Sequence, residues 1–300
     1  MNQPELITTT TQLEALVTRL LAEEAVAVDT EFFWETTFYP ILGLVQLAVR
    51  DGSCWLVDPL SIKDLSTLGP VMSSTSVTKV LHDAPQDLGI LARATGALPR
   101  SIFDTRVAAG FAGLSATASL KTLLQEVLGV TLAKEETRSN WLQRPLREGQ
   151  LRYAADDVLH LLDLRERLVK ACANDEVRVQ QAEAMQKLDD PSGYQDRDPR
   201  LMYQRIKGNE RLNASELAVL REVAAWREEE ARRRDWPRGH VLPDRLLVML
   251  AQRKPATVTA VTEIPDFPRN MPSEVLVQLH SAITRGLALP PDDWPSPRKK

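Results

Sequence analysis

The segment Val-Ala-Val-Asp-Thr-Glu-Phe, residues 26–32, places two carboxylates, Asp29 and Glu31, one residue apart at the end of an apolar run. The run predicts a buried strand. Side chains at positions i and i+2 of a strand project from one face, so the two carboxylates would lie within a few ångströms of each other. Like charges that close require a cation, or one carboxyl group must stay protonated. The segment therefore favours a metal-dependent site, although an isolated pair of this kind usually marks only a strand that meets solvent.

The composition indicates a protein of about two domains from a reducing compartment. The chain has 300 residues, of which 43% are hydrophobic and 26% charged, and this is more than one compact core usually holds. Cys54 and Cys172 are its only cysteines, and they lack the spacing of a disulfide framework or a structural zinc site. The N-terminus shows no basic region followed by an apolar stretch, and no run approaches 18 apolar residues. We expect a cytoplasmic protein without a membrane partner.

The net charge of −4 conceals an uneven distribution of charge along the chain. Residues 200–255 carry 13 Lys and Arg against 8 Asp and Glu, a balance of +5 that leaves −9 for the rest. An acidic site beside a basic module would suit a polyanionic substrate. Charge alone favours the simpler explanation, which is a set of solvated helix faces.

The apolar runs predict an α/β domain with a mixed sheet at residues 1–175. Leu44–Arg50 and Cys54–Val57 are the next predicted strands, and Asp51-Gly52 between them is a hairpin signal, so the sheet begins antiparallel. Thr78–Leu81 is a fourth short strand. Helical patterns follow it at residues 87–92, 117–128 and 148–171.

The chain changes character beyond residue 175. Residues 176–203 are predicted to form a connecting helix and linker, because residues 189–199 are polar and rich in turn formers. A small all-helical module is expected at residues 204–288, with helices from about Ala214, at Leu246–Leu250 and at Val275–Ile283. The Pro-rich tail, residues 289–300, is expected to be disordered.

Two later segments supply further acidic side chains and a phenol. Asp87 falls in the first turn of the helix after Thr78–Leu81, where the helix dipole favours a carboxylate, although such a residue is often only a cap. Tyr153 and Asp157 are four residues apart in a predicted helix and share a face, whereas Asp156 points elsewhere. Each pattern alone is commonly a surface feature, so the combination of all three segments carries the prediction.

These segments resemble, in order and spacing, the three exonuclease motifs of the DEDD superfamily, tyrosine subtype. The motifs are Val-Asp-Thr-Glu-Phe at 28–32, Leu-His-Asp-Ala-Pro-Gln-Asp-Leu at 81–88 and Tyr-Ala-Ala-Asp-Asp at 153–157. With residues 39–47, 103–105 and 139–146, the chain closely resembles the bacterial ribonuclease D family over about residues 24–170. Residues 205–208, 220–232 and 237–246 resemble an HRDC domain, a small helical bundle that accompanies this family. This chain has room for one such domain, where some members carry two.

The resemblance implies a ribonuclease-H-like exonuclease domain followed by a small all-α HRDC bundle. It also implies 3′-5′ hydrolysis of RNA at single-stranded 3′ ends, releasing nucleoside 5′-monophosphates, with transfer RNA precursors as the substrate class. By position, the catalytic residues would be Asp29, Glu31, Asp87, Tyr153 and Asp157. The four acids would bind two Mg²⁺ or Mn²⁺ ions, which prefer hard oxygen ligands, and Tyr153 would orient water.

Four other residues are candidate substrate contacts. Trp141 and Arg144 could stack on a base and pair with phosphate, or could equally pack beside the active-site helix. Phe32 could wedge against the terminal base. His82 could act as a base but is more often structural at a strand end. A phenol with an ordinary pKa near 10 is a poor base, so we assign Tyr153 a positioning role.

Two further polar features of the sequence are weaker candidates for a functional role. Gln46 interrupts an apolar strand, and a hydrogen bond to a neighbouring loop is the favoured explanation. Arg232-Arg233-Arg234 with Arg238 could bind phosphate. However, the acidic residues 228–230 offer partners, and a self-paired helix is nearly as consistent with the pattern.

Two alternative functions stay open at this point. The first is a DNA 3′-5′ exonuclease, because the same four-acid site serves both polymers and the residues that read the 2′-hydroxyl cannot be located from sequence. The second is a non-catalytic nucleic-acid-binding protein. The presence of all five expected site residues disfavours it.

Overall fold

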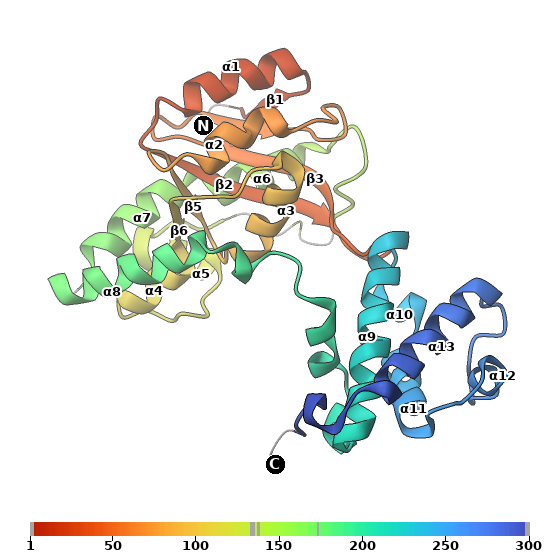
Figure 1. Cartoon of the computed structure of the whole chain (residues 1–300). Helices are drawn as coiled ribbons and strands as arrows, with labels where there is room; N and C mark the ends of the chain where they lie inside the picture. The colour runs from red at the N-terminus through yellow and green to blue at the C-terminus, as the bar shows by residue number, and fades with distance from the viewer. Residues whose placement is uncertain (1–2, 133–135, 137–138, 173, 298–300) are drawn as a thin grey trace. The chain divides into compact units, whose positions relative to one another are not determined.

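The computed structural model describes residues 3–132, 136, 139–172 and 174–297, and the chain divides into two compact units (Figure 1). The first unit comprises Met1–Phe33 and Pro40–Gln195, and the second comprises Trp34–Tyr39 and Asp196–Lys300. The first compact unit therefore extends past the expected domain boundary at residue 175. Helix α8 (Asp175–Gln186) belongs to the first unit, because its Met185 is buried in that core.

The first unit is built on a six-stranded sheet in the order β1-β4-β3-β2-β5-β6. The strands are β1 (Glu5–Ile7), β2 (Ala25–Phe33), β3 (Ile41–Ala48), β4 (Cys54–Val57), β5 (Thr78–Leu81) and β6 (Ile102–Asp104). β2, β3 and β4 form the antiparallel start that the sequence predicts, whereas β1, β5 and β6 pair in parallel. β1 and β6 were not predicted, because three residues are too short to show an alternating pattern.

Helices cover both faces of this mixed sheet. The side chains of Val26 and Val28 on β2 pack in the layer formed by α1 (Thr10–Leu20), α2 (Gly69–Ser73) and α3 (Pro85–Thr95). Ala27 packs in the opposite layer. That layer contains α4 (Thr105–Phe111), α5 (Leu120–Leu128), α6 (Glu148–Leu159), α7 (Leu161–Lys170) and α8. The predicted helical stretch 148–171 is thus two helices, separated at His160.

A bulge interrupts the pairing of β2 with β3 beside the predicted carboxylates. Glu31 pairs with Leu44 and Phe32 with Leu42, so Gly43 is the extra residue. A Cβ atom on Gly43 would lie 2.9 Å from both the Cβ and the carbonyl oxygen of Trp141. Glycine is required here by this close approach, and bulges of this kind often occur next to active sites.

The second unit is a helical bundle. Its helices are α9 (Ala214–Arg234), α10 (Arg238–Val241), α11 (Asp244–Arg253), α12 (Val258–Thr262) and α13 (Ser273–Ala288). Asn213 caps α9 with a capping box to Glu216. Phe38 is buried in the core of this unit, and its backbone N–H donates to the Asp235 carboxylate at 3.0 Å. These contacts explain why residues 34–39 belong to the second unit.

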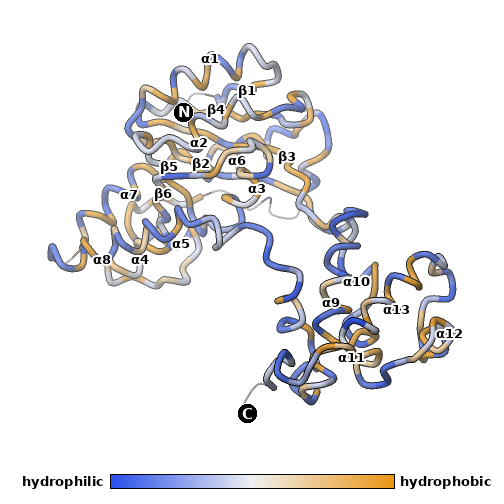
Figure 2. Tube along the Cα trace, in the orientation of Figure 1, coloured by the Kyte–Doolittle hydropathy of each residue, from blue (hydrophilic) through white to orange (hydrophobic). Residues whose placement is uncertain are grey.

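The polar connection between the units and the C-terminal tail contain local structure. Short 3₁₀ turns occur at Lys187–Asp189, Pro191–Gly193 and Pro199–Arg205, and the connection is hydrophilic (Figure 2). In the tail, which the sequence predicts to be disordered, Trp294 Nε1 donates to the Leu289 carbonyl and Arg221 donates to that of Asp293. Residues 298–300 lie outside the described part. Within the described residues, no helix combines the length and apolar character needed to cross a bilayer.

Candidate active site

Three of the predicted acidic residues meet at one point in the first unit. Asp29 and Glu31 project from the same face of β2, and Asp157 comes from α6, which packs against that face. One carboxylate oxygen from each residue lies within 4.8 Å of the others. The structure thus brings Asp157 to two side chains that precede it by 126 and 128 positions in the sequence.

Burial and mutual repulsion make this group of carboxylates costly to ionise. Burial, followed by the charges of Asp157 and Asp87, raises the pKa of Glu31 from 4.5 to about 9. Burial, followed by the charges of Asp87, Asp157 and Glu31, raises the pKa of Asp29 well above its ordinary value. A cation would remove this repulsion, and a donor set of oxygens alone suits a hard divalent ion. The residues present therefore fit a divalent metal site.

Asp87 lies in the first turn of α3, as the sequence predicts. Its carboxylate accepts a hydrogen bond from the hydroxyl of Thr30, the residue between Asp29 and Glu31. Burial raises the pKa of Asp87 to about 6, while the Thr30 hydrogen bond opposes this shift. Asp87 is not one of the three residues whose oxygens lie within 4.8 Å, but its charge contributes to the raised pKa of Asp29.

Tyr153 lies on α6 one turn before Asp157. Burial, then the charges of Asp157 and Glu31 and a hydrogen bond to Asp157, raise the pKa of the phenol well above its ordinary value of 10. The phenol therefore keeps its proton at neutral pH and can donate a hydrogen bond but cannot act as a base. The ring of Trp141 packs beside it, with 6.1 Å between ring centroids.

Trp141 and Arg144 make internal contacts, so the structure favours packing over substrate contact for both. Trp141 is 2% exposed and lies in the core. The guanidinium group of Arg144 donates to both carboxylate oxygens of Asp58, at 2.9 and 2.7 Å, and to the carbonyl of Gly43 at 2.7 Å. Both residues hold the loop that precedes α6 in contact with the bulge at Gly43 in β3. A stacking or phosphate contact of either residue stays a prediction, and the packing alternative is the one that these contacts support.

His82 and Phe32 occupy positions of different kinds. The Nδ1 atom of His82 lies 2.9 Å from the hydroxyl of Thr105, and burial lowers the pKa of the imidazole. This agrees with the structural alternative for His82. Phe32 is half-buried next to the bulge, immediately after Glu31, and its contact with substrate stays a prediction.

Asp104 holds the backbone turn that precedes Asp87, and the sequence assigned it no role. Its carboxylate is 1% exposed and accepts hydrogen bonds from the backbone N–H groups of Asp83 and Ala84 before α3, and of Arg106 and Val107 in α4. Ala84 provides α3 with no side-chain cap, and Asp83 has a left-handed φ of 61°. Asp104 therefore holds the turn that places Asp87. The only sequence signal was the resemblance carried by Phe103-Asp104-Thr105.

The arginine-rich stretch of α9 is self-paired. Arg232 and Arg238 pair with Glu228, which is 1% exposed, and Arg233 and Arg234 pair with Glu230, which is 4% exposed. These arginines are thus already engaged by carboxylates. The self-paired alternative describes this helix better than a phosphate-binding stripe does.

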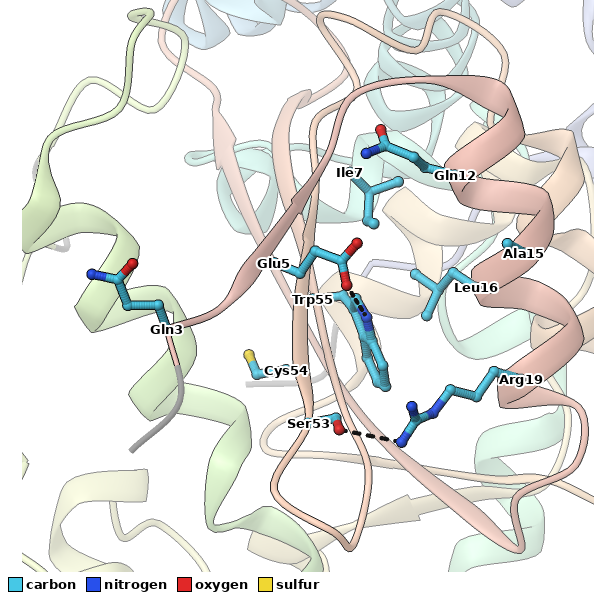
Figure 3. Close-up of a pocket in the computed structure, with 10 residues that line it drawn as sticks. All are labelled: Gln3, Glu5, Ile7, Gln12, Ala15, Leu16, Arg19, Ser53, Cys54 and Trp55. Carbon is cyan, nitrogen blue, oxygen red and sulfur yellow. Dashed lines mark hydrogen bonds between the residues drawn. The ribbon is translucent and has the colours of Figure 1, made fainter.

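A separate pocket of about 420 Å³ lies between α1 and the edge of the sheet formed by β1 and β4 (Figure 3). Trp55 Nε1 donates to the Glu5 carboxylate at 3.1 Å, and Arg19 donates to the Ser53 hydroxyl at 3.2 Å. The Arg19 guanidinium also covers the Trp55 ring, 4.8 Å from its centroid. None of the clustered carboxylates lines this pocket, so it is distinct from the candidate active site.

A mixed sheet with clustered carboxylates on its central strand and on a facing helix defines an acidic-site 3′-5′ exonuclease. The profile of the 3′-5′ exonuclease family matches residues 4–173, and that of the HRDC domain matches residues 216–272. Ribonuclease D from Desulfotalea psychrophila is 45% identical over 255 residues, covering 85% of this chain and 68% of that protein. The chain belongs to the ribonuclease D family and is a 3′-5′ exoribonuclease.

Solved structures agree with this assignment. Escherichia coli RNase D, described as an exoribonuclease involved in structured RNA processing, is 30% identical with a TM-score of 0.85, covering 100% of this chain and 79% of that chain. Brucella melitensis NrnC with bound Mg²⁺ is 30% identical with a TM-score of 0.51, covering 58% of this chain and 85% of that chain. The expected ribonuclease-H-like exonuclease domain followed by an HRDC bundle is therefore confirmed.

Proposed function

We propose that the chain trims the 3′ ends of transfer RNA precursors in the cytoplasm by hydrolysis that depends on two divalent ions. The convergence of Asp29, Glu31 and Asp157 within 4.8 Å, with Asp87 close by, is the observation that supports this most strongly. Both cysteines, Cys54 and Cys172, are unpaired and buried, which supports a reducing compartment.

Asp29, Glu31, Asp87 and Asp157 would hold the ions. Asp29 would be the most important of these ligands, because its carboxylate is the one on which the charges of Asp87, Asp157 and Glu31 all act. Two ions bound there would activate water and stabilise the leaving 3′-oxygen. Mg²⁺ is supported by its presence in Brucella melitensis NrnC, and Mn²⁺ offers the same preference for oxygen ligands.

Tyr153 would orient the attacking water through a hydrogen bond with its protonated phenol, whose hydrogen bond to Asp157 places the hydroxyl beside the carboxylates. The water oxygen bonds to phosphorus, the bond from phosphorus to the 3′-oxygen breaks, and that oxygen takes up a proton as the shortened RNA leaves. The released product is a nucleoside 5′-monophosphate. Because the pKa of Tyr153 lies well above neutrality, the proton of the water goes to solvent and not to the phenol.

The direct test is to incubate the protein with 5′-labelled single-stranded RNA, with and without Mg²⁺ or Mn²⁺. A ladder that shortens from the 3′ end and disappears with chelator is the expected result. A 3′-phosphate-blocked RNA tests whether a free 3′-hydroxyl is required, and a transfer RNA precursor with a 3′ extension tests the proposed substrate class. A DNA oligonucleotide of the same sequence tests the DNA exonuclease alternative. Equal or faster turnover of the DNA would favour that alternative, whereas binding without a ladder would favour the non-catalytic one.

Tyr153→Phe is expected to lower kcat by about 10- to 100-fold with little change in KM, because the hydroxyl and its hydrogen bonds to water and to Asp157 are lost while the buried ring is kept. The shape of the pH profile of kcat should not change, since the phenol does not titrate near neutrality. Tyr194→Phe is the matched control, because within the described residues its buried hydroxyl has no hydrogen-bond partner. Loss of one limb of the pH profile in Tyr153→Phe would instead identify the phenol as a base.

A further inference from the structure

Gln46 lies on β3 directly beside the carboxylate site. Its exposed fraction is 0%, and its register partner on β2 is Asp29. In an antiparallel pair, residues directly opposite each other share a face, with Cβ atoms about 4.5–5.5 Å apart. The packing of β3 agrees, because Leu44 lies in the layer of α6 whereas Val45 and Leu47 lie in the opposite layer. The Gln46 side chain is therefore on the face that carries the candidate metal ligands.

The Gln46 carboxamide has no partner within the described residues. Its Nε2 and Oε1 atoms are both buried, and neither forms a hydrogen bond there, so the loop contact expected from the sequence is not formed. An unsatisfied buried polar group costs about 1–3 kcal/mol, and native structures contain few of them. An apolar residue of similar size would avoid this cost between Val45 and Leu47. The amide is thus suited to a partner that appears only when the site is occupied.

We propose that Gln46 is a positioning residue for Asp29. When divalent ions occupy the carboxylate site, the Gln46 Nε2–H donates to the Asp29 carboxylate, directly or through one buried water, and fixes the orientation of that carboxylate. Carboxylates that bind metal ions are commonly held by hydrogen bonds of this kind. The inference rests on the metal site proposed above and deepens it by adding a residue outside the acidic set.

Gln46→Met tests this role, because methionine is close to glutamine in length and shape and lacks the amide. Without RNA, the dissociation constant for Mn²⁺ measured by calorimetry is expected to rise about tenfold or more, as in other sites that lose a partner of a metal ligand. The Tm of the metal-free protein should stay the same or rise, because an unsatisfied amide is removed. Leu47→Met is the matched control, since it alters a buried residue on the same strand that faces the other layer, and it should leave Mn²⁺ affinity unchanged.

Wild-type Mn²⁺ affinity in Gln46→Met would overturn the proposal and would leave Gln46 as a structural residue paired with a buried water. Gln46→Leu carries the same expectation if the methionine variant does not fold, and failure of both to fold would likewise assign a structural role. If the wild-type protein itself binds no Mn²⁺, the proposed metal site fails. That outcome differs from a failure of the Gln46 proposal alone, in which the wild type and Gln46→Met both bind Mn²⁺ and do so equally well.

Discussion

Asp29→Asn is expected to lower kcat by about 10³-fold or more, because the substitution removes a negative charge at the point where the carboxylates converge. The amide keeps the shape of the side chain but is a weaker ligand for a hard cation. The fold should remain intact. The metal-free protein should even gain stability, since Asp29 is repelled by the charges of Asp87, Asp157 and Glu31.

The measurement compares kcat on 5′-labelled RNA with the Tm of the metal-free protein. Asp156→Asn is the matched control, because Asp156 neighbours Asp157 on α6 yet lines a pocket with Glu148 and Arg152 away from the site. It should keep kcat within a few-fold of the wild type. Near-normal activity of Asp29→Asn would remove Asp29 from the proposed set of metal ligands. Loss of activity together with a lower Tm would point to a defect of folding.

Local patterns in the sequence predicted the strands and helices that carry the site. Asp29 and Glu31 could be placed on one face because strand alternation is strict, and Tyr153 could be placed one turn before Asp157 because helical spacing is equally regular. The family resemblance then joined segments that periodicity alone could not bring together. The geometry of the acidic cluster follows from these two kinds of information.

Features that depend on contacts between distant segments could not be predicted in the same way. The carboxylate of Asp104 holds two turns at once, and this is visible only when β5 and β6 lie side by side. The sequence left two alternatives open for Trp141 and Arg144, because an aromatic ring and a guanidinium group suit RNA but can equally pack beside the active-site helix. Their actual partners, Gly43 and Asp58, are about 100 and 86 residues away.

Residues 34–39 pack in the second unit, so removal of the rest of that unit would affect them. The sequence suggests that removal of the residues after about 198 would mainly weaken RNA binding. However, Phe38 is buried in the core of the second unit, and the Arg238 guanidinium lies 4.4 Å from its ring centroid. Truncation would therefore expose an apolar segment just after β2, and point substitutions are the cleaner test.

Without metal ions, the stability of the protein is expected to fall as the pH rises from about 5 to 9. The pKa of Glu31 is 4.5 in its ordinary state and about 9 in the folded chain, chiefly because of burial and then the charges of Asp157 and Asp87. Between these values the folded chain holds a proton that the unfolded chain has released. The free energy of unfolding then decreases by about 1.4 kcal/mol per pH unit for each such proton. For a unit of this size, 1 kcal/mol corresponds to about 2–4 °C in Tm.

Glu31→Gln tests this contribution, because it keeps the side-chain shape and removes both the titrating group and the charge that helps to raise the pKa of Asp29. Burial lowers the pKa of His82, and of Lys79 to about 8, which acts in the opposite direction, but both groups are common to the two proteins and cancel in the difference. In chelator, the Tm of Glu31→Gln should exceed that of the wild type at pH 8, and the gap should narrow towards pH 5. Mn²⁺ should raise the wild-type Tm more at pH 8 than at pH 5, since ion binding requires deprotonated carboxylates and favours the folded state. Parallel Tm curves for the two proteins from pH 5 to 9 would show that Glu31 takes up no proton on folding, and the electrostatic argument for a cation at this site would then lose its main support.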